Sequence, residues 1–131
     1  MRIRRVTLDL SSGPPVRGSV ECLAFDPWRA QQAALELERD GLLCVTWPQT
    51  DARACPASET LYRAIIEQRL TLPEHPKLAE HAHNCVQRHS RRGWRFDAPS
   101  RGANIDSIVS LVMALERAEA QPERVRLLGW I

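Results

Sequence analysis

Three stretches of the chain have the hydrophobic pattern of β-strands. Apolar and polar residues alternate over residues 3–10, which is typical of a strand with one buried face. Short, mainly apolar runs over residues 20–25 and 42–47 are typical of more deeply buried strands. The segment Ser-Ser-Gly-Pro-Pro at 11–15 favours a sharp break between the first two strands.

A helix is predicted between the second and third strands. Asp26 and Pro27 favour its start, because Asp caps free backbone N–H groups and Pro is well tolerated at the first helical position. Gly41 favours its end, since glycine readily adopts the left-handed conformation that closes helices. The resulting strand–helix–strand order predicts parallel pairing of the strands at 20–25 and 42–47 through a right-handed crossover.

Three further helices and a hairpin are predicted in the remaining sequence. The helices are expected over residues 58–70, from Pro76 onwards and over residues 105–119, and two short strands are expected around Gly93. The apolar residues expected on the buried faces of these helices are Leu61, Ala64, Ile65, Leu72, Leu78, Ala79, Ala82, Val86, Ile105, Ile108, Val109, Val112 and Leu115. The whole pattern predicts a mixed α/β domain.

Length and composition are those of one globular domain, spanning residues 1–131. The chain is 44% hydrophobic and 26% charged, which is ordinary for a soluble protein. No apolar run reaches the roughly 20 residues that a membrane-spanning helix needs, and no apolar segment of a secretory signal follows the basic N-terminus. We therefore expect a cytoplasmic protein without a membrane partner, whose four cysteines are buried and reduced: Cys22, Cys44, Cys55 and Cys85.

Three aspartates are candidate metal ligands. Asp26 follows a predicted strand, where sites of open α/β sheets gather, while Asp106 starts the last predicted helix and Asp9 lies on the first predicted strand. Each also has a structural explanation, because Asp26 can cap a helix, Asp106 can complement a helix dipole and Asp9 can simply face solvent. Together they have the chemistry of a two-metal site for Mg²⁺ or Mn²⁺, whose preferred ligands are carboxylate oxygens.

Positive charge is concentrated in residues 87–101, although the whole chain has a net charge of only +2. This segment contains five arginines and one aspartate, a local balance of +4. Such a segment suits a phosphate backbone, and it equally suits the solvated surface of a hairpin. The candidate DNA-binding residues are Arg88, Arg91, Arg92, Arg95 and Arg101.

Several motifs, in the same order, resemble the nuclease domain of phage terminase large subunits. The resemblance extends over residues 20–131 and leaves an atypical strand and loop at residues 1–19. The matching segments are Ala-Phe-Asp-Pro-Trp-Arg at 24–29, Leu-Glu-Arg-Asp-Gly at 37–41, Trp-Pro-Gln-Thr at 47–50, Leu-Tyr-Arg-Ala-Ile-Ile at 61–66, His-Ala-His-Asn at 81–84, Asn-Ile-Asp-Ser-Ile-Val-Ser-Leu-Val-Met-Ala at 104–114 and Leu-Gly-Trp at 128–130.

The resemblance implies an RNase H-like fold of the retroviral integrase type, a mixed sheet flanked by helices, shortened here at its N-terminus. It implies that three acidic residues hold divalent ions and hydrolyse double-stranded DNA during viral packaging in a bacterial host cell. Asp26 matches the second acidic residue and Asp106 the third. Asp9 either replaces the first on a shortened scaffold or is an accidental aspartate, because only 17 positions separate it from Asp26.

The packaging motor of such a subunit is not expected on this chain. A phosphate-binding loop needs a glycine-rich turn leading into Gly-Lys-Ser/Thr, and the single lysine, Lys77, follows Pro76 with no glycine nearby. The expected partners are therefore double-stranded DNA, the terminase small subunit, the portal or an ATPase domain on another chain, and a second copy of this chain.

Two other functions remain open on the sequence. One is a catalytically inactive prophage remnant that folds or self-associates, favoured by the shortened N-terminus. The other is a zinc module using His81, Cys85 and His89, spaced four residues apart. Zinc is disfavoured because eight helical residues rise about 12 Å, whereas zinc ligands lie within about 2.0–2.3 Å of one ion.

Overall fold

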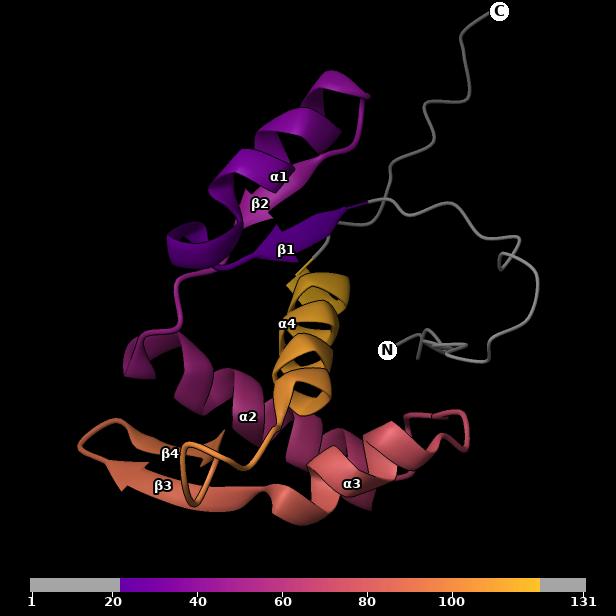
Figure 1. The fold of residues 1–131 in the computed structure, drawn as a ribbon. Helices are drawn as coiled ribbons and strands as arrows, with labels where there is room; N and C mark the ends of the chain where they lie inside the picture. Colours follow the sequence, from indigo (N-terminus) through magenta and orange to yellow (C-terminus); the bar gives the residue numbers. More distant parts are fainter. Residues whose placement is uncertain (1–21, 121–131) are drawn as a thin grey trace, which may run out of the picture.

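The structure is a computed structural model that describes residues 22–120. A strand–helix–strand unit is followed by two helices, a hairpin and a final helix that stands between the two parts (Figure 1). The predicted strand over residues 3–10, with Asp9, and the motif at 128–130 lie outside the described residues. The elements are β1 Leu23–Phe25, α1 Pro27–Arg39, β2 Cys44–Thr46, α2 Asp51–Ile66, α3 Pro76–Asn84, β3 Val86–Ser90, β4 Gly93–Asp97 and α4 Asp106–Ala120.

The first unit has the predicted order of elements, but its strands are only partly buried, because a two-stranded sheet covers little of them; Leu43, just before β2, is 59% exposed. β1 and β2 pair in parallel, with Leu23 opposite Cys44. The amide of Trp47, just beyond β2, donates to the carbonyl of Phe25 at 2.7 Å and closes the carboxyl end of the pair. Gly41 has φ 89°, the left-handed conformation expected of a glycine after a helix. The predicted parallel strand–helix–strand arrangement is confirmed.

Helix α2 begins seven residues before the predicted start and ends at Ile66 rather than at residue 70. The prediction began after Pro56, but the helix includes this proline, which lacks the N–H that would bond to the carbonyl four residues earlier. Packing explains why the helix nevertheless extends across it. Buried residues recur at helical spacing on both sides of the proline: Ala54, Cys55, Ala57, Ser58, Leu61 and Ala64.

Some residues predicted for buried helix faces are exposed. Ile65 is 49% exposed, and Ala79 and Ala82 of α3 also face solvent. Val86 is not helical at all, because α3 ends at Asn84 and Val86 begins β3 with 41% exposure. The prediction that all apolar residues of this helix are buried was wrong, because α3 is short. It packs on the core mainly through Leu78 and a buried polar residue, His81.

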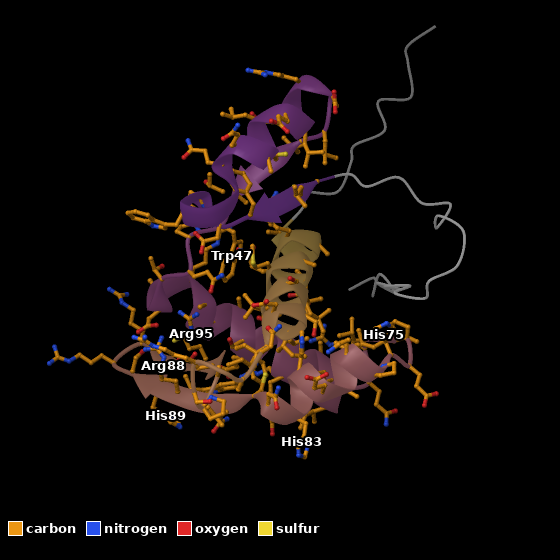
Figure 2. All side chains as sticks on the ribbon, viewed as in Figure 1. Trp47, His75, His83, Arg88, His89 and Arg95 are labelled. Carbon is orange, nitrogen blue, oxygen red and sulfur yellow. The ribbon has the colours of Figure 1, made fainter. Side chains whose placement is uncertain are left out.

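The hydrophobic core lies where α4 packs against α2 and α3. Trp47 is 1% exposed and connects this core to the β1–β2 sheet, between the two parts of the molecule (Figure 2). The buried residues of the core are Trp47, Ala54, Ala57, Leu61, Ala64, Leu78, Ile108, Leu111, Val112, Met113 and Leu115. The predicted amphipathic helix at 105–119 is therefore confirmed as the central element of the fold.

The predicted strands around Gly93 form an antiparallel hairpin, with Ser90 opposite Gly93 across the turn. Gly93 has φ 115°, and the hydroxyl of Ser90 accepts from the amide of Arg92 at 3.2 Å. Ser at the first and Gly at the fourth position of a turn is a common preference. β4 packs on α2, where the amide of Phe96 donates to the Ser58 hydroxyl at 3.3 Å.

The four cysteines are free thiols, as predicted, but they are not all buried. Cys55 is buried on α2, whereas Cys22, Cys44 and Cys85 are partly exposed. The short strands explain the difference, because a two-stranded sheet leaves Cys22 and Cys44 near its edges.

Within residues 22–120, no helix is both long and apolar enough to cross a membrane.

Candidate functional site

Asp26 is positioned by the junction between β1 and α1. Its backbone is extended, and one carboxylate oxygen accepts from the amide of Trp28 at 3.0 Å, so the residue caps α1. Beside it, Trp28 is 92% exposed. An N-cap uses one carboxylate oxygen and leaves the other available to a ligand. Asp26 therefore does have the predicted structural role, at the carboxyl end of a parallel strand.

Asp106 is the first residue of α4, and its side chain faces solvent. The start of this helix is held by two side chains. The Asn104 amide oxygen accepts from the Asp106 amide at 3.1 Å, and Nδ1 of buried His81 accepts from the Ser107 amide at 3.1 Å. The Ser107 hydroxyl also lies 2.8 Å from this nitrogen. These partners satisfy backbone donors that a helix start leaves free.

The contacts of α4 place Asp26 and Asp106 at opposite ends of this helix. α4 begins beside α3 and ends beside the β1–β2 sheet (Figure 1). Its residue Glu116 accepts from the indole N–H of Trp47 at 2.9 Å, next to the end of β1 that leads into Asp26. Asp106 and Glu116 are ten residues apart, which is about 15 Å along a helix axis.

This arrangement does not form a two-metal site from the described residues alone. The two ions of such a site lie about 3.5–4 Å apart, so Asp26 and Asp106 would both have to reach the same small volume. Between residues 22 and 120, no three His, Cys, Asp or Glu side chains are grouped as metal ligands. The position of Asp9 falls outside this range, so its predicted role stays a prediction.

The zinc alternative gains no support from the histidine positions. His81 is buried and bonded to Ser107, while His83 and His89 point outward from α3 and β3 (Figure 2). Cys85 donates to the carbonyl of His81 at 3.3 Å. Burial raises the pKa of the Cys85 thiol above its ordinary value.

Two of the five candidate arginines are engaged in ion pairs. Arg88 and Arg95 lie close together on the hairpin, near the start of α2 (Figure 2). A carboxylate oxygen of Asp51 lies 3.2 Å from Arg88 and 3.4 Å from Arg95. Asp97 pairs with Arg88 at 2.5 Å. Sequence reasoning missed Asp51, because it placed this residue in a loop before α2 rather than in its first turn.

The other three arginines are exposed. Arg91 and Arg92 form the turn between β3 and β4, and Arg101 lies in the loop before α4. None of the three makes an ion pair with a carboxylate among the residues that the structure describes. Their guanidinium groups are therefore accessible to an anionic partner.

The architecture is that of a small mixed α/β domain with its candidate acidic residues at a strand end and a helix start, and it is similar to a bacteriophage large terminase. The chain aligns with the crystal structure of the large terminase of bacteriophage HK97 at a TM-score of 0.61 and 28% sequence identity. The alignment covers 73% of this chain and 21% of that terminase, so the chain spans about a fifth of its length. The predicted resemblance to a domain of the terminase large subunit is confirmed.

Comparisons with protein-family models and with the sequences of curated proteins give no match.

Proposed function

We propose that this chain acts on DNA in the packaging of a phage genome, as a domain of a terminase large subunit. The similarity to the HK97 large terminase carries this proposal, because it extends over 73% of the chain with 28% identity. The proposed fold is a shortened RNase H-like domain. The parallel β1–α1–β2 unit and the closing helix α4 support it, although the described sheets have only two strands each.

The proposed activity is cleavage of double-stranded DNA that depends on Mg²⁺ or Mn²⁺, with Asp26, Asp106 and Asp9 as the acidic residues. Its support is the order of the motifs that carry Asp26 and Asp106. Since the described residues hold these two aspartates at opposite ends of α4, cleavage requires a rearrangement or additional chain segments that bring acidic groups together. The small subunit, the portal and an ATPase domain on another chain are the proposed partners.

A second candidate function is a folded terminase domain without nuclease activity, a remnant of a prophage gene. The specific observation favouring it is the separation of Asp26 and Asp106, which the contacts of Glu116 with Trp47 and of Ser107 with His81 maintain. A bridging carboxylate is what keeps two ions close, so a domain without one binds such ions weakly.

Plasmid nicking by the purified chain with Mn²⁺ distinguishes the two functions. A nuclease should nick and linearise the plasmid, and EDTA should abolish this. Asp106→Ala and Asp26→Ala should each remove the activity, whereas Asp40→Ala, which removes an exposed carboxylate at the end of α1, should keep it. Asp9→Ala then shows whether that residue completes the acidic set.

Absence of nicking from a sample that is folded by circular dichroism supports the remnant. Nicking that survives both Asp26→Ala and Asp106→Ala would reject the proposed acidic residues, and a contaminating nuclease would then be the explanation to test.

A further inference from the structure

The five arginines of residues 87–101 are not equivalent, and the ion pairs separate them. Asp51 and Asp97 neutralise Arg88 and Arg95, which also fix the hairpin against α2. Arg95 additionally donates to the backbone carbonyl of Gln49 at 2.9 Å, and its side chain is only 12% exposed. A guanidinium with these partners has few free donors left for a phosphate.

Arg91 and Arg92 have the opposite environment. They are adjacent and exposed, and neither forms an ion pair with a carboxylate within residues 22–120. The Ser90 hydroxyl and the φ of 115° at Gly93 fix the backbone of the turn that carries them. Two free guanidinium groups on an ordered turn are suited to bidentate phosphate contacts.

The hairpin is held on α2 and presents Arg91 and Arg92 at the surface of the domain. β4 packs on α2, whereas Val86–His89 of β3 are exposed, so the ribbon has one supported strand and one open strand. The base of the turn rests on α2, since the Ser90 hydroxyl lies 3.7 Å from the Cys55 thiol, whereas Arg91 and Arg92 are exposed. Phosphates lie on the outside of the DNA duplex, where the exposed arginines of the turn can contact them.

We propose that the tip of the β3–β4 hairpin, Arg91 and Arg92, is the phosphate-contacting surface for double-stranded DNA, and that Arg88 and Arg95 hold the hairpin in place instead. This inference rests on the proposed role in DNA packaging and identifies the residues that meet the DNA. The contact is independent of sequence, because phosphate contacts position a protein without reading bases.

The test is the salt dependence of binding to a short labelled DNA duplex, measured by fluorescence anisotropy in EDTA so that cleavage plays no part. Losing two phosphate contacts should lower the slope of log K against log salt by about 2 and weaken binding on the order of tenfold at low salt. We expect this of the double variant Arg91→Ala/Arg92→Ala. Its circular dichroism should equal that of the unchanged chain, because both residues are exposed.

The control for total charge is Arg63→Ala/Lys77→Ala, which removes the same formal charge from exposed positions on α2 and α3 (side chains 66% and 69% exposed), where Arg63 pairs with Glu59 and Lys77 with Glu80. It should change the slope much less than the tip variant does. Arg88→Gln should lower Tm, because Arg88 links the hairpin to Asp51 of α2, but it should change the slope by well under about 1, because no phosphate contact is lost.

Equal losses in the tip and control variants would overturn the inference, because total charge would then explain binding. The inference would also be overturned if the unchanged chain binds DNA and the tip variant binds it equally well. The proposed packaging role would then remain intact. A slope reduced by about 1 in Arg88→Gln would refute the division of the arginines. If the unchanged chain does not bind duplex DNA at low salt, both this inference and the proposed action on DNA fail.

Discussion

Trp47 connects the β1–β2 sheet to the helices, and the loss of stability on replacing it is a direct test of the fold. The side chain is 1% exposed, and its indole N–H donates to Glu116 of α4 at 2.9 Å. The guanidinium of Arg53 lies over the ring, 5.1 Å from its centre, and also pairs with Glu116 at 3.2 Å. One residue at the end of β2 thus joins the sheet to both α2 and α4.

Two substitutions separate the contributions of packing and hydrogen bonding. Trp47→Ala removes the buried ring and should cost about 3–5 kcal/mol of unfolding free energy. Trp47→Phe keeps most of the packing but loses the indole donor, and a hydrogen bond to a charged group contributes about 1.5–3 kcal/mol. Glu116 keeps Arg53 as a partner and its side chain is 27% exposed, so we expect the lower part of that range, about 1.5–2 kcal/mol.

The assay is thermal unfolding followed by circular dichroism. For a domain of this size, 1 kcal/mol shifts Tm by about 4–8 °C. Trp47→Phe should therefore lower Tm by roughly 5–15 °C and Trp47→Ala by roughly 15–30 °C. Trp28→Ala is the matched control, since Trp28 is 92% exposed and its loss should leave Tm nearly unchanged. A small shift in Trp47→Ala, or equal shifts in Trp47→Ala and Trp28→Ala, would refute the arrangement described for Trp47.

Three further outcomes are expected from local geometry. Gly93→Ala should lower the free energy of unfolding in urea by about 1–3 kcal/mol, because φ is 115° there and a side chain strains this backbone. The added Cβ itself would have room, with its nearest neighbour at 3.7 Å. Gly102→Ala is the control and should cost nothing measurable, since Gly102 has open space and no positive φ. His81→Ala should lower the free energy of unfolding by about 1–3 kcal/mol, because the Ser107 amide at the start of α4 loses its acceptor. His81→Asn should lower it less, because the Asn amide oxygen can accept from Ser107 in place of Nδ1. Equal Tm values for the two variants would contradict the capping role of His81. Because burial raises the pKa of the Cys85 thiol, peptide mapping should show slower alkylation of Cys85 in the folded than in the urea-unfolded chain near pH 8, and equal rates would show that this thiol is not protected.

The sequence predicted those parts of the fold that depend on local signals. Asp26 and Pro27 begin α1, Gly41 follows its end, and the apolar steps from Ile105 onward form α4. It failed where packing outweighed a local preference. Pro56 disfavours a helix, yet α2 extends through it because the flanking residues are buried against α4 and the hairpin.

The candidate site was less predictable than the fold, because its geometry depends on which ends of the elements meet. Asp26 and Asp106 could each be assigned a local role, a cap and a first-turn carboxylate, and the structure confirms both roles. Their separation follows from the direction in which α4 packs, and no local pattern encodes that direction. The neutralisation of Arg88 likewise depends on Asp51, which is 37 positions away in the sequence.

The placement of α4 gives the nuclease proposal a structural requirement. His81 and Asn84 of α3 hold the start of the helix, through the Ser107 amide and the Asn104 carbonyl, and Glu116 holds its C-terminal half beside Trp47. Bringing Asp106 to the end of β1 would require a movement comparable to the roughly 15 Å between Asp106 and Glu116 along the axis, so at least one of these attachments would have to break. If both Asp26 and Asp106 prove necessary for cleavage, Trp47→Phe should therefore alter the rate of nicking as well as Tm. If cleavage needs Asp26 but not Asp106, the acidic partners of Asp26 must come from outside the arrangement described for residues 22–120.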